Sequence, residues 1–333
     1  MENTTLRLVS AYDYSDYFAI TIEADKWYGK KAYCRYFDKN WMELEPAVES
    51  IGFPEFAYYC CKRTLAKYMS ISETKSGTVN FTVPVLNRKI DEPKYTLSLC
   101  LAPLYGDFER KWLLLAELVD DYVKTGEAEV VFFREEQDRT SNEWQHVEIE
   151  DCALRSLHHS RYSIFADLDD RITALGSSTL VDYISQTLTE RTNFALLCFA
   201  VRYILRMRKS PEMYEGEQTL LDHLPTLVFR NTTSPSPTGA AAKCVADPRR
   251  VMAMGIHNSY ISMPGYKTFF VPPDKAINMH YREPYGDGWY KRRIALVSRY
   301  GPFKIEGYPN HLIDPLYRNV KRRLDRVYGV NSL

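Results

Sequence analysis

Residues 162–170 read Tyr-Ser-Ile-Phe-Ala-Asp-Leu-Asp-Asp and join an apolar segment to a run of acidic residues. The apolar part, Tyr162–Ala166, has the β-branched and aromatic composition of a buried strand. Ligands of open α/β sheets bind at the carboxyl ends of the strands. We therefore expect Asp167 and Asp169 at a functional edge, and alternation along an extended chain would point both side chains to the same side.

Two neighbouring carboxylates repel each other unless a proton or a cation lies between them. A hard divalent cation such as Mg²⁺ or Mn²⁺ prefers oxygen ligands and accepts substrate phosphates as further ligands. Asp167 and Asp169 are therefore candidate metal ligands, and the metal would neutralise a diphosphate leaving group. Two other interpretations stay open: acidic residues that only end a strand, and a phosphatase loop of the D-x-D-x-T kind. Arg171 stands at the Thr position of that loop, which counts against a phosphatase.

Alternating apolar patterns surround this segment from residue 94 to the end of the chain. We expect strands at Tyr95–Leu101, Glu127–Phe133 and Phe194–Leu205, and helices at Glu109–Lys124, Trp144–His158, Leu180–Leu188 and Pro309–Tyr328. Such alternation implies βαβ units, hence an α/β fold with a mostly parallel sheet and helices on both faces. The last helix is basic, which is typical of a solvated helix face.

Residues 1–93 show a different pattern, with short β-branched and aromatic segments separated by Gly, Asn, Asp and Pro. We expect strands at Leu6–Ala11, Tyr17–Glu23, Ala32–Phe37, Phe56–Lys62 and Thr78–Val85. A charged connector, Asn87–Pro93, follows them. The sequence therefore predicts two domains, a small β-rich N-terminal domain at 1–93 and a larger domain at 94–333.

The composition argues against several classes of protein and bears on the cellular compartment. The 333 residues contain 43 Lys+Arg and 43 Asp+Glu, and this balance argues against a dedicated nucleic-acid binder. No apolar stretch reaches the roughly 18 residues of a membrane span, and Met1–Ser10 lacks signal-peptide features. Taken literally, this predicts a soluble cytosolic protein, but glycosylation sequons at Asn3, Asn80 and Asn231 point to the secretory pathway. Seven cysteines without a C-x-x-C pair argue against a zinc site and fit either free thiols or a partial disulfide set.

Other polar residues are candidates for the same site. His280 and Arg282 could close a metal–diphosphate site, although a single His is often only structural. Arg155 precedes the aspartate strand and could hold a phosphate or a sugar hydroxyl, or lie on a helix surface. Glu217 and Asp222 could act as general bases, or simply belong to a polar helix start.

Several segments, taken in order, resemble the catalytic domain of glycosyltransferase family 92. They are residues 95–106 with 111–117, 121–130, 166–171, 214–218 with 223–225, 243–248 with 254–257, 264–266 and 280–282. Residues 10–13 also resemble the β region that precedes this domain in the family. Each segment alone is weak, whereas the ordered set over residues 95–290 is fairly specific.

The resemblance implies a GT-A fold and a metal-dependent inverting glycosyltransferase. It implies a UDP-sugar donor, a divalent metal such as Mn²⁺, and a glycan or glycoprotein acceptor. The best-known activity of the family is transfer of galactose from UDP-galactose to glycan fucose, and its members are typically Golgi membrane proteins. By position, the resemblance implies Asp167, Asp169 and His280 as metal ligands, Arg155 and Arg282 at the donor, Pro103, Leu104 and Tyr105 beside the nucleotide, and Glu217 or Asp222 as the base.

Two departures from the family pattern are visible. This sequence contains no membrane anchor, and it lacks one β–α unit that the family places after Val119. Loss of that unit would remove a strand near the nucleotide, so we expect weak donor binding or none. The alternative function is therefore a catalytically inactive glycosyltransferase-like binding or scaffold protein. A metal-dependent phosphohydrolase is a more distant third.

Overall fold

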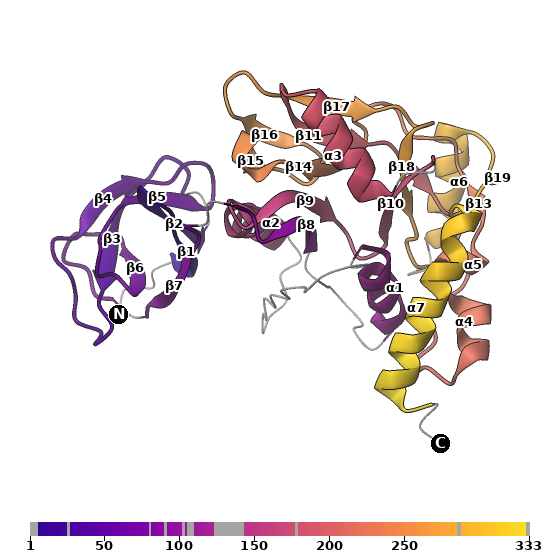
Figure 1. Cartoon of the computed structure of the whole chain (residues 1–333), viewed down its shortest axis with the longest axis horizontal. Helices are drawn as coiled ribbons and strands as arrows, with labels where there is room; N and C mark the ends of the chain where they lie inside the picture. Colours follow the sequence, from indigo (N-terminus) through magenta and orange to yellow (C-terminus); the bar gives the residue numbers. More distant parts are fainter. Residues whose placement is uncertain are drawn as a thin grey trace. The chain divides into compact units, whose positions relative to one another are not determined.

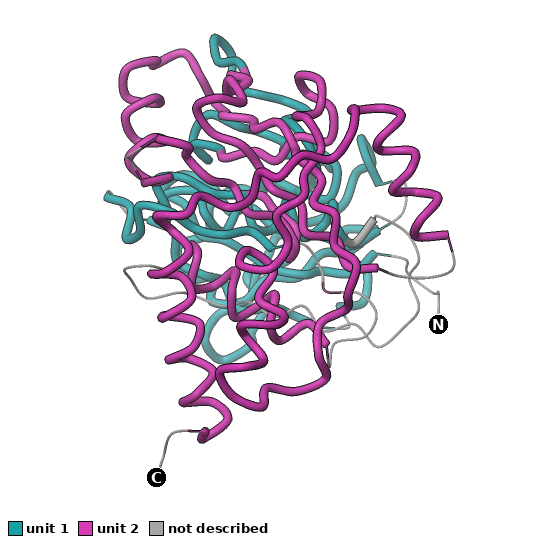
Figure 2. The backbone as a smooth tube through the Cα atoms, turned by 90° about the vertical axis from the view of Figure 1, so that its right-hand side faces the viewer, with its two compact units in different colours: residues 1–103, 133–164, 246–267 teal, residues 104–132, 165–245, 268–333 magenta. Residues whose placement is uncertain are grey.

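The computed structural model describes residues 6–24, 27–79, 81–89, 92–101, 104, 110–122, 143–176, 179–284 and 288–330. The chain forms two compact units, which Figure 2 distinguishes by colour. Unit 1 contains residues 1–103, 133–164 and 246–267, and unit 2 contains residues 104–132, 165–245 and 268–333. Each unit is thus built from three separate segments. The two-domain division expected at residue 93 remains a prediction.

The N-terminal part of unit 1 is a seven-stranded barrel (Figure 1). Its strands are β1 (Arg7–Asp13), β2 (Tyr17–Glu23), β3 (Lys31–Phe37), β4 (Val48–Ile51), β5 (Ala57–Cys61), β6 (Tyr68–Ser72) and β7 (Val83–Asn87), in the order β4-β3-β6-β7-β1-β2-β5. An antiparallel bridge between Gly52 and Tyr58 joins the two ends of this order. The β-rich N-terminal region is therefore confirmed, while β4 and β6 are strands that the sequence pattern did not indicate.

Period-two alternation explains the barrel core, because it directs one side of each strand inward. Ala11, Ile20 and Tyr58 are fully buried there. A disulfide between Cys34 and Cys60 joins β3 to β5, which lie on either side of β4 where the barrel closes. This covalent bond therefore supplements a small core.

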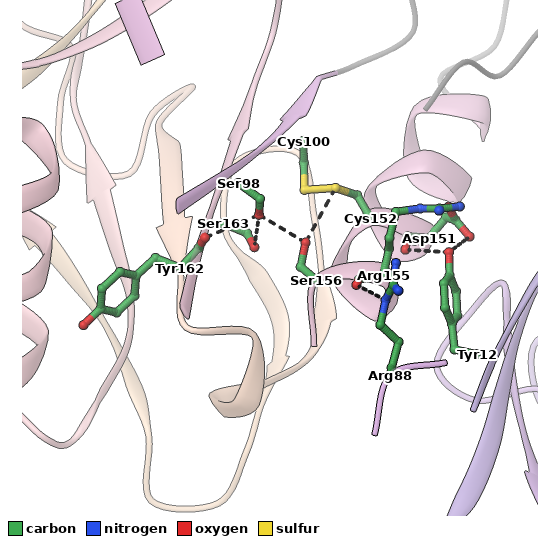
Figure 3. Close-up of a disulfide and its surroundings, with 10 residues drawn as sticks. All are labelled: Tyr12, Arg88, Ser98, Cys100, Asp151, Cys152, Arg155, Ser156, Tyr162 and Ser163. Atoms are coloured by element: carbon green, nitrogen blue, oxygen red, sulfur yellow. Dashed lines mark hydrogen bonds and ion pairs between the residues drawn. A yellow bond between two sulfur atoms is a disulfide. The ribbon is translucent and has the colours of Figure 1, made fainter. Parts of the chain in front are cut away.

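The rest of unit 1 packs around one helix. Its elements are β8 (Tyr95–Leu101), α2 (Glu143–Ser156), most of β9 (Ser160–Ala166), η1 (Pro248–Arg250), β15 (Val251–Met254) and β16 (Ser259–Ser262). A disulfide between Cys100 and Cys152 joins β8 to α2, and Ser98 bonds to Ser156 and Ser163 beside it (Figure 3). The predicted strand at Tyr95–Leu101 is confirmed in full.

Unit 2 is a mixed α/β arrangement. Its elements are α1 (Trp112–Tyr122), β10 (Asp170–Ala174), α3 (Leu180–Glu190), β11 (Phe194–Phe199), β12 (Val201–Tyr203), α4 (Glu217–His223), α5 (Pro225–Val228), β13 (Asn231–Thr232), β14 (Lys243–Ala246), β17 (Lys267–Val271), β18 (Ala276–His280), α6 (Trp289–Tyr300), β19 (Lys304–Ile305) and α7 (Asn310–Tyr328). Strand β18 pairs antiparallel with β10 and parallel with β12. This three-stranded sheet is mixed, so the expected α/β class is confirmed while this sheet is not mostly parallel.

One predicted strand is divided in two. We expected a single strand at Phe194–Leu205, but β11 ends at Phe199 and β12 begins at Val201. At the break, the Ala200 carbonyl accepts a hydrogen bond from Asn278 N at 2.9 Å, and Val201 N donates to Ser236 Oγ at 3.0 Å. The chain changes its hydrogen-bond partners at this point, and an apolar pattern does not reveal such a change.

Helix α7 forms one wall of the unit 2 core and lies against α1, α4 and α5 (Figure 1). Its buried residues repeat with helical spacing: Ile313, Leu316, Val320 and Leu324. The helices predicted at Glu109–Lys124, Trp144–His158, Leu180–Leu188 and Pro309–Tyr328 are confirmed with small shifts in their ends, within the described residues. The strand predicted at Glu127–Phe133 lies outside the described residues. In the part of the chain that the structure describes, no helix is both long and apolar enough to cross a bilayer.

Candidate metal-binding site

The acidic run forms a turn between two strands of different sheets. Strand β9 ends at Ala166 and β10 begins at Asp170. Asp170 N donates to the Asp167 carbonyl at 3.1 Å, and Asp167 N donates to Asp170 Oδ2 at 3.0 Å. The extended geometry from which we argued a common side for Asp167 and Asp169 therefore stops before both residues. Their side chains are positioned by the turn and by the partners described below.

Strand pairing brings His280 to this turn. Asp170 and His280 are paired residues in the β10–β18 ladder, and His280 Nδ1 lies 2.9 Å from Asp170 Oδ1 and 3.7 Å from Asp169 Oδ1. Asn278 Nδ2 donates to Asp170 Oδ1 at 2.7 Å. One ligand atom each from Asp169, Asp170 and His280 lies within 4.8 Å of the others. These three residues form a candidate metal site.

The chemistry of these residues fits a divalent cation. Two carboxylates and one imidazole suit Mn²⁺ or a similar ion. Asn278 is fully buried, and its amide oxygen has no hydrogen-bond partner among the described residues. An unsatisfied buried oxygen on a side chain that contacts Asp170 is the kind of ligand that hard cations prefer.

Two cationic side chains compensate the carboxylates. Buried Lys243 places Nζ 3.0 Å from Asp167 Oδ2 and 3.6 Å from Asp170 Oδ2. Arg282 Nε donates to Asp169 Oδ2 at 2.7 Å, and its Nη2 lies 4.0 Å from Asp167 Oδ2. The turn is thus held in a dense network of opposite charges.

Burial and these cationic partners shift the pKa values of the acidic groups in opposite directions. Burial would raise the pKa of Asp170, but Lys243, His280 and the hydrogen bond from Asn278 outweigh it and hold that pKa below its ordinary value. For Asp167, burial and the neighbouring Asp170 carboxylate win, and its pKa is raised. The site therefore holds Asp170 in its charged form more firmly than Asp167.

The predicted metal ligands are thus only partly brought together. Asp169 and His280 belong to the three-residue cluster, whereas the Asp167 carboxylate is held by Lys243. Whether Asp167 also binds the metal stays a prediction. Arg171, which stands at the Thr position of a phosphatase loop, is fully buried and paired with Glu117.

Of the residues predicted at the donor, Arg282 contacts the cluster through Asp169, and four others remain to be placed. Arg155 is in unit 1, where it bonds to Asp151 at 3.3 Å and lies over the Tyr12 ring; Figure 3 shows these residues together. Pro103 and Tyr105 lie outside the described residues, and Leu104 is half-buried. The roles of these four residues at the donor stay predictions.

The candidate bases lie on α4, which packs on α5 and α7. Glu217 accepts a hydrogen bond from the Tyr317 hydroxyl at 2.8 Å, and Asp222 accepts one from Gln218 Nε2 at 3.0 Å. Among the interactions of the described residues, none links either carboxylate to the Asp169 cluster. Their role as bases stays a prediction, while the polar helix start is confirmed because α4 begins at Glu217.

Two residues of the candidate site were missed by the sequence argument. Asp170 had a signal, because it is the third acidic residue of the run, but D-x-D spacing drew attention to its neighbours. Lys243 begins the family-like segment at residues 243–248, but that segment assigned no role to its side chain. Its place beside Asp167 and Asp170 results from tertiary structure.

Comparison with known proteins adds an independent observation. A search of curated proteins found no match to the chain. A comparison with protein families matches residues 115–316 to glycosyltransferase family 92. This match covers more than half of the chain and contains the acidic turn, Lys243, His280 and Arg282. The chain therefore belongs to glycosyltransferase family 92.

Proposed function

We propose that this protein is a metal-dependent inverting glycosyltransferase that transfers a hexose, with galactose as first candidate, from a UDP-sugar to a glycan acceptor. Family membership supports sugar transfer. The Asp169, Asp170 and His280 cluster is the single observation that supports metal dependence.

Asp169, Asp170 and His280 would hold the cation. Bound there, Mn²⁺ would act as a Lewis acid that stabilises negative charge on the departing diphosphate. The Arg282 side chain is 42% exposed and so can reach a donor phosphate while its Nε bonds to Asp169.

The acceptor hydroxyl needs a base to take its proton during an inverting displacement. We propose Glu217 and Asp222 as candidates, because both residues are exposed and each carboxylate accepts a hydrogen bond from a neutral donor. Isosteric Glu217→Gln and Asp222→Asn variants separate them: loss of transfer without loss of donor binding identifies the base.

We also propose a Golgi location. Three disulfides, Cys34–Cys60, Cys100–Cys152 and Cys198–Cys244, support an oxidising compartment. The sequons noted above agree with it. Immunofluorescence of the tagged protein beside a Golgi marker tests this location.

Calorimetric titration of UDP into the whole protein, with and without Mn²⁺, tests the donor site. The proposed function predicts UDP binding that requires Mn²⁺ and that Asp169→Ala abolishes, although we expect this binding to be weak because a β–α unit near the nucleotide is absent from the sequence pattern. Asp274→Ala is the matched control, because Asp274 is an exposed carboxylate of the same unit that pairs with its neighbour Lys275.

A folded chain that binds no UDP under either condition would instead favour the glycosyltransferase-like binding or scaffold protein. The β–α unit missing after Val119 would then be the first cause to examine. Hydrolysis of a phosphate monoester by the purified protein would favour the phosphohydrolase.

A further inference from the structure

A fully buried ion pair lies directly behind the acidic turn. Arg171 follows Asp170 in β10, and alternation along the strand directs its side chain to the opposite face from the metal cluster. Arg171 Nη2 lies 2.9 Å from Glu117 Oε2 of α1, and both side chains are completely buried. This pair belongs to none of the functional roles described above.

The guanidinium holds the backbone of the turn itself. Arg171 Nη1 donates to the carbonyls of Leu168 and Asp170, both at 2.9 Å. These two carbonyls lie on either side of Asp169. From the β18 side, Tyr281 N donates to the Asp169 carbonyl at 2.7 Å. Three successive carbonyls of the turn are thus fixed, so the backbone that carries Asp169 and Asp170 has little freedom to move.

The guanidinium is in turn held from behind by two helices. Its Nη2 also donates to the Leu114 carbonyl of α1 at 3.0 Å. Glu117 Oε1 accepts hydrogen bonds from Thr226 N at 3.0 Å and from Thr226 Oγ1 at 2.7 Å. A continuous chain of hydrogen bonds therefore runs from α5 through α1 to the turn.

We propose that Arg171 is a positioning residue that sets the spacing of Asp169 and Asp170 for a divalent cation, with Glu117 and Thr226 as its support. The inference rests on the proposed metal site. A buried ion pair is weak evidence for stability, because apolar residues of similar volume often serve as well. By contrast, mutating the residues that orient metal ligands through hydrogen bonds typically weakens metal affinity 10–100-fold.

Lysine cannot replace arginine in this arrangement. The planar guanidinium presents donors in fixed directions, and here it serves three carbonyls and one carboxylate at once. An ammonium keeps the charge for Glu117 but has three donors on a flexible stem. Arg171→Lys therefore preserves the charge and removes the rigid set of hydrogen bonds to the turn, which we call the clamp.

The test measures Mn²⁺ affinity of the whole protein without donor, by electron paramagnetic resonance of free Mn²⁺. Arg171→Lys is expected to raise the Mn²⁺ Kd about tenfold or more. Thr226→Val removes only the hydroxyl that supports Glu117 and is expected to raise it about threefold, since one of several supports is lost. The spectrum of bound Mn²⁺ is a second readout, because altered ligand geometry broadens its lines.

Arg323→Gln is the matched control. Arg323 forms a two-point ion pair with Asp120, on the same helix α1 as Glu117, and no hydrogen bond or ion pair among the described residues links it to the turn. Its loss is expected to leave the Mn²⁺ Kd unchanged. A general loosening of α1 would affect all three variants, whereas a clamp on the turn affects only Arg171→Lys and Thr226→Val.

The outcomes separate the inference from the proposed function. If the wild-type chain binds no Mn²⁺, the metal site itself is wrong. If the wild type binds Mn²⁺ and both folded test variants bind it equally well, the metal site stands and the positioning role is overturned. Should Arg171→Lys fail to fold, Thr226→Val decides alone.

Discussion

Asp170 and His280 face each other across the antiparallel pair of β10 and β18, and His280 Nδ1 lies 2.9 Å from Asp170 Oδ1. Side chains of directly opposed residues in such a pair lie close together on one face of the sheet. The pairing therefore makes Asp170, rather than Asp167, the carboxylate that joins Asp169 and His280 in one cluster.

Asp170→Asn should weaken Mn²⁺ binding more than Asp167→Asn does. Asp170 belongs to the cluster, and its neighbours keep it charged, whereas the Asp167 carboxylate is held by Lys243. We expect the Kd to rise about 100-fold for Asp170→Asn and tenfold or less for Asp167→Asn, by calorimetry. A larger loss for Asp167→Asn would show that the sequence-based ligand set was the better one.

Lys243→Met should destabilise the metal-free protein and tighten Mn²⁺ binding. Removing this buried cation leaves Asp167 without its nearest positive charge and Asp170 without one of its cationic partners, at a cost of about 3 kcal/mol in unfolding free energy. The same change removes repulsion between the ammonium and an incoming cation, so the Kd should fall about tenfold.

Thermal unfolding of Lys243→Met with and without Mn²⁺ checks both the lower stability and the lower Kd, since a ligand that binds more tightly stabilises the folded state more. Lys275→Met is the control, because Lys275 is 64% exposed and pairs only with Asp274. Equal stabilisation of wild type and Lys243→Met by saturating Mn²⁺ would contradict the expected coupling.

Glu148 and Glu150 of α2 should make the stability of unit 1 depend on pH. Burial raises the pKa of each to about 8, well above the value near 4.5 of an exposed carboxyl. The folded state therefore keeps protons that the unfolded state releases. The stability that these groups contribute is full below about pH 4.5 and is lost as the pH rises through about 8.

Glu150→Gln should flatten that pH dependence. An amide stays neutral at every pH, so the unfolding free energy at pH 8 should rise by about 4 kcal/mol, with little change near pH 4.5. Chemical denaturation at several pH values checks it. Glu73→Gln, at an exposed position of the same unit, should leave the slope unchanged.

The Cys198–Cys244 disulfide should stabilise unit 2. It joins β11 to β14, the strand that begins with Lys243, and it closes a loop of 46 residues. Cys198→Ser should lower the unfolding free energy by about 4 kcal/mol, measured by denaturation against Cys61→Ser as control.

Cys61 is the exposed free thiol, so the denatured wild-type chain should react with one equivalent of thiol reagent. A higher count would contradict the three disulfides.

Local sequence patterns were enough to predict the helices and strands whose apolar residues repeat regularly within the element itself. The strand Tyr95–Leu101 and the helix ending at Tyr328 follow from apolar spacing that is read within one turn or one strand. The ordered motifs also identified the family, which the match over residues 115–316 confirms. Asp169 and His280 were found as candidate ligands because strand ends and rare residues stand out in a sequence.

The tertiary structure decided which side chains meet. Strand pairing set Asp170 opposite His280, and the turn at Leu168 ended the alternation on which the Asp167 argument depended. Lys243 comes from a strand more than 70 residues away, and the family-like segment at residues 243–248 did not indicate that its side chain reaches the acidic turn. A sequence reveals spacing along the chain, whereas register between distant strands depends on packing, and packing placed Lys243 and His280 at the acidic turn.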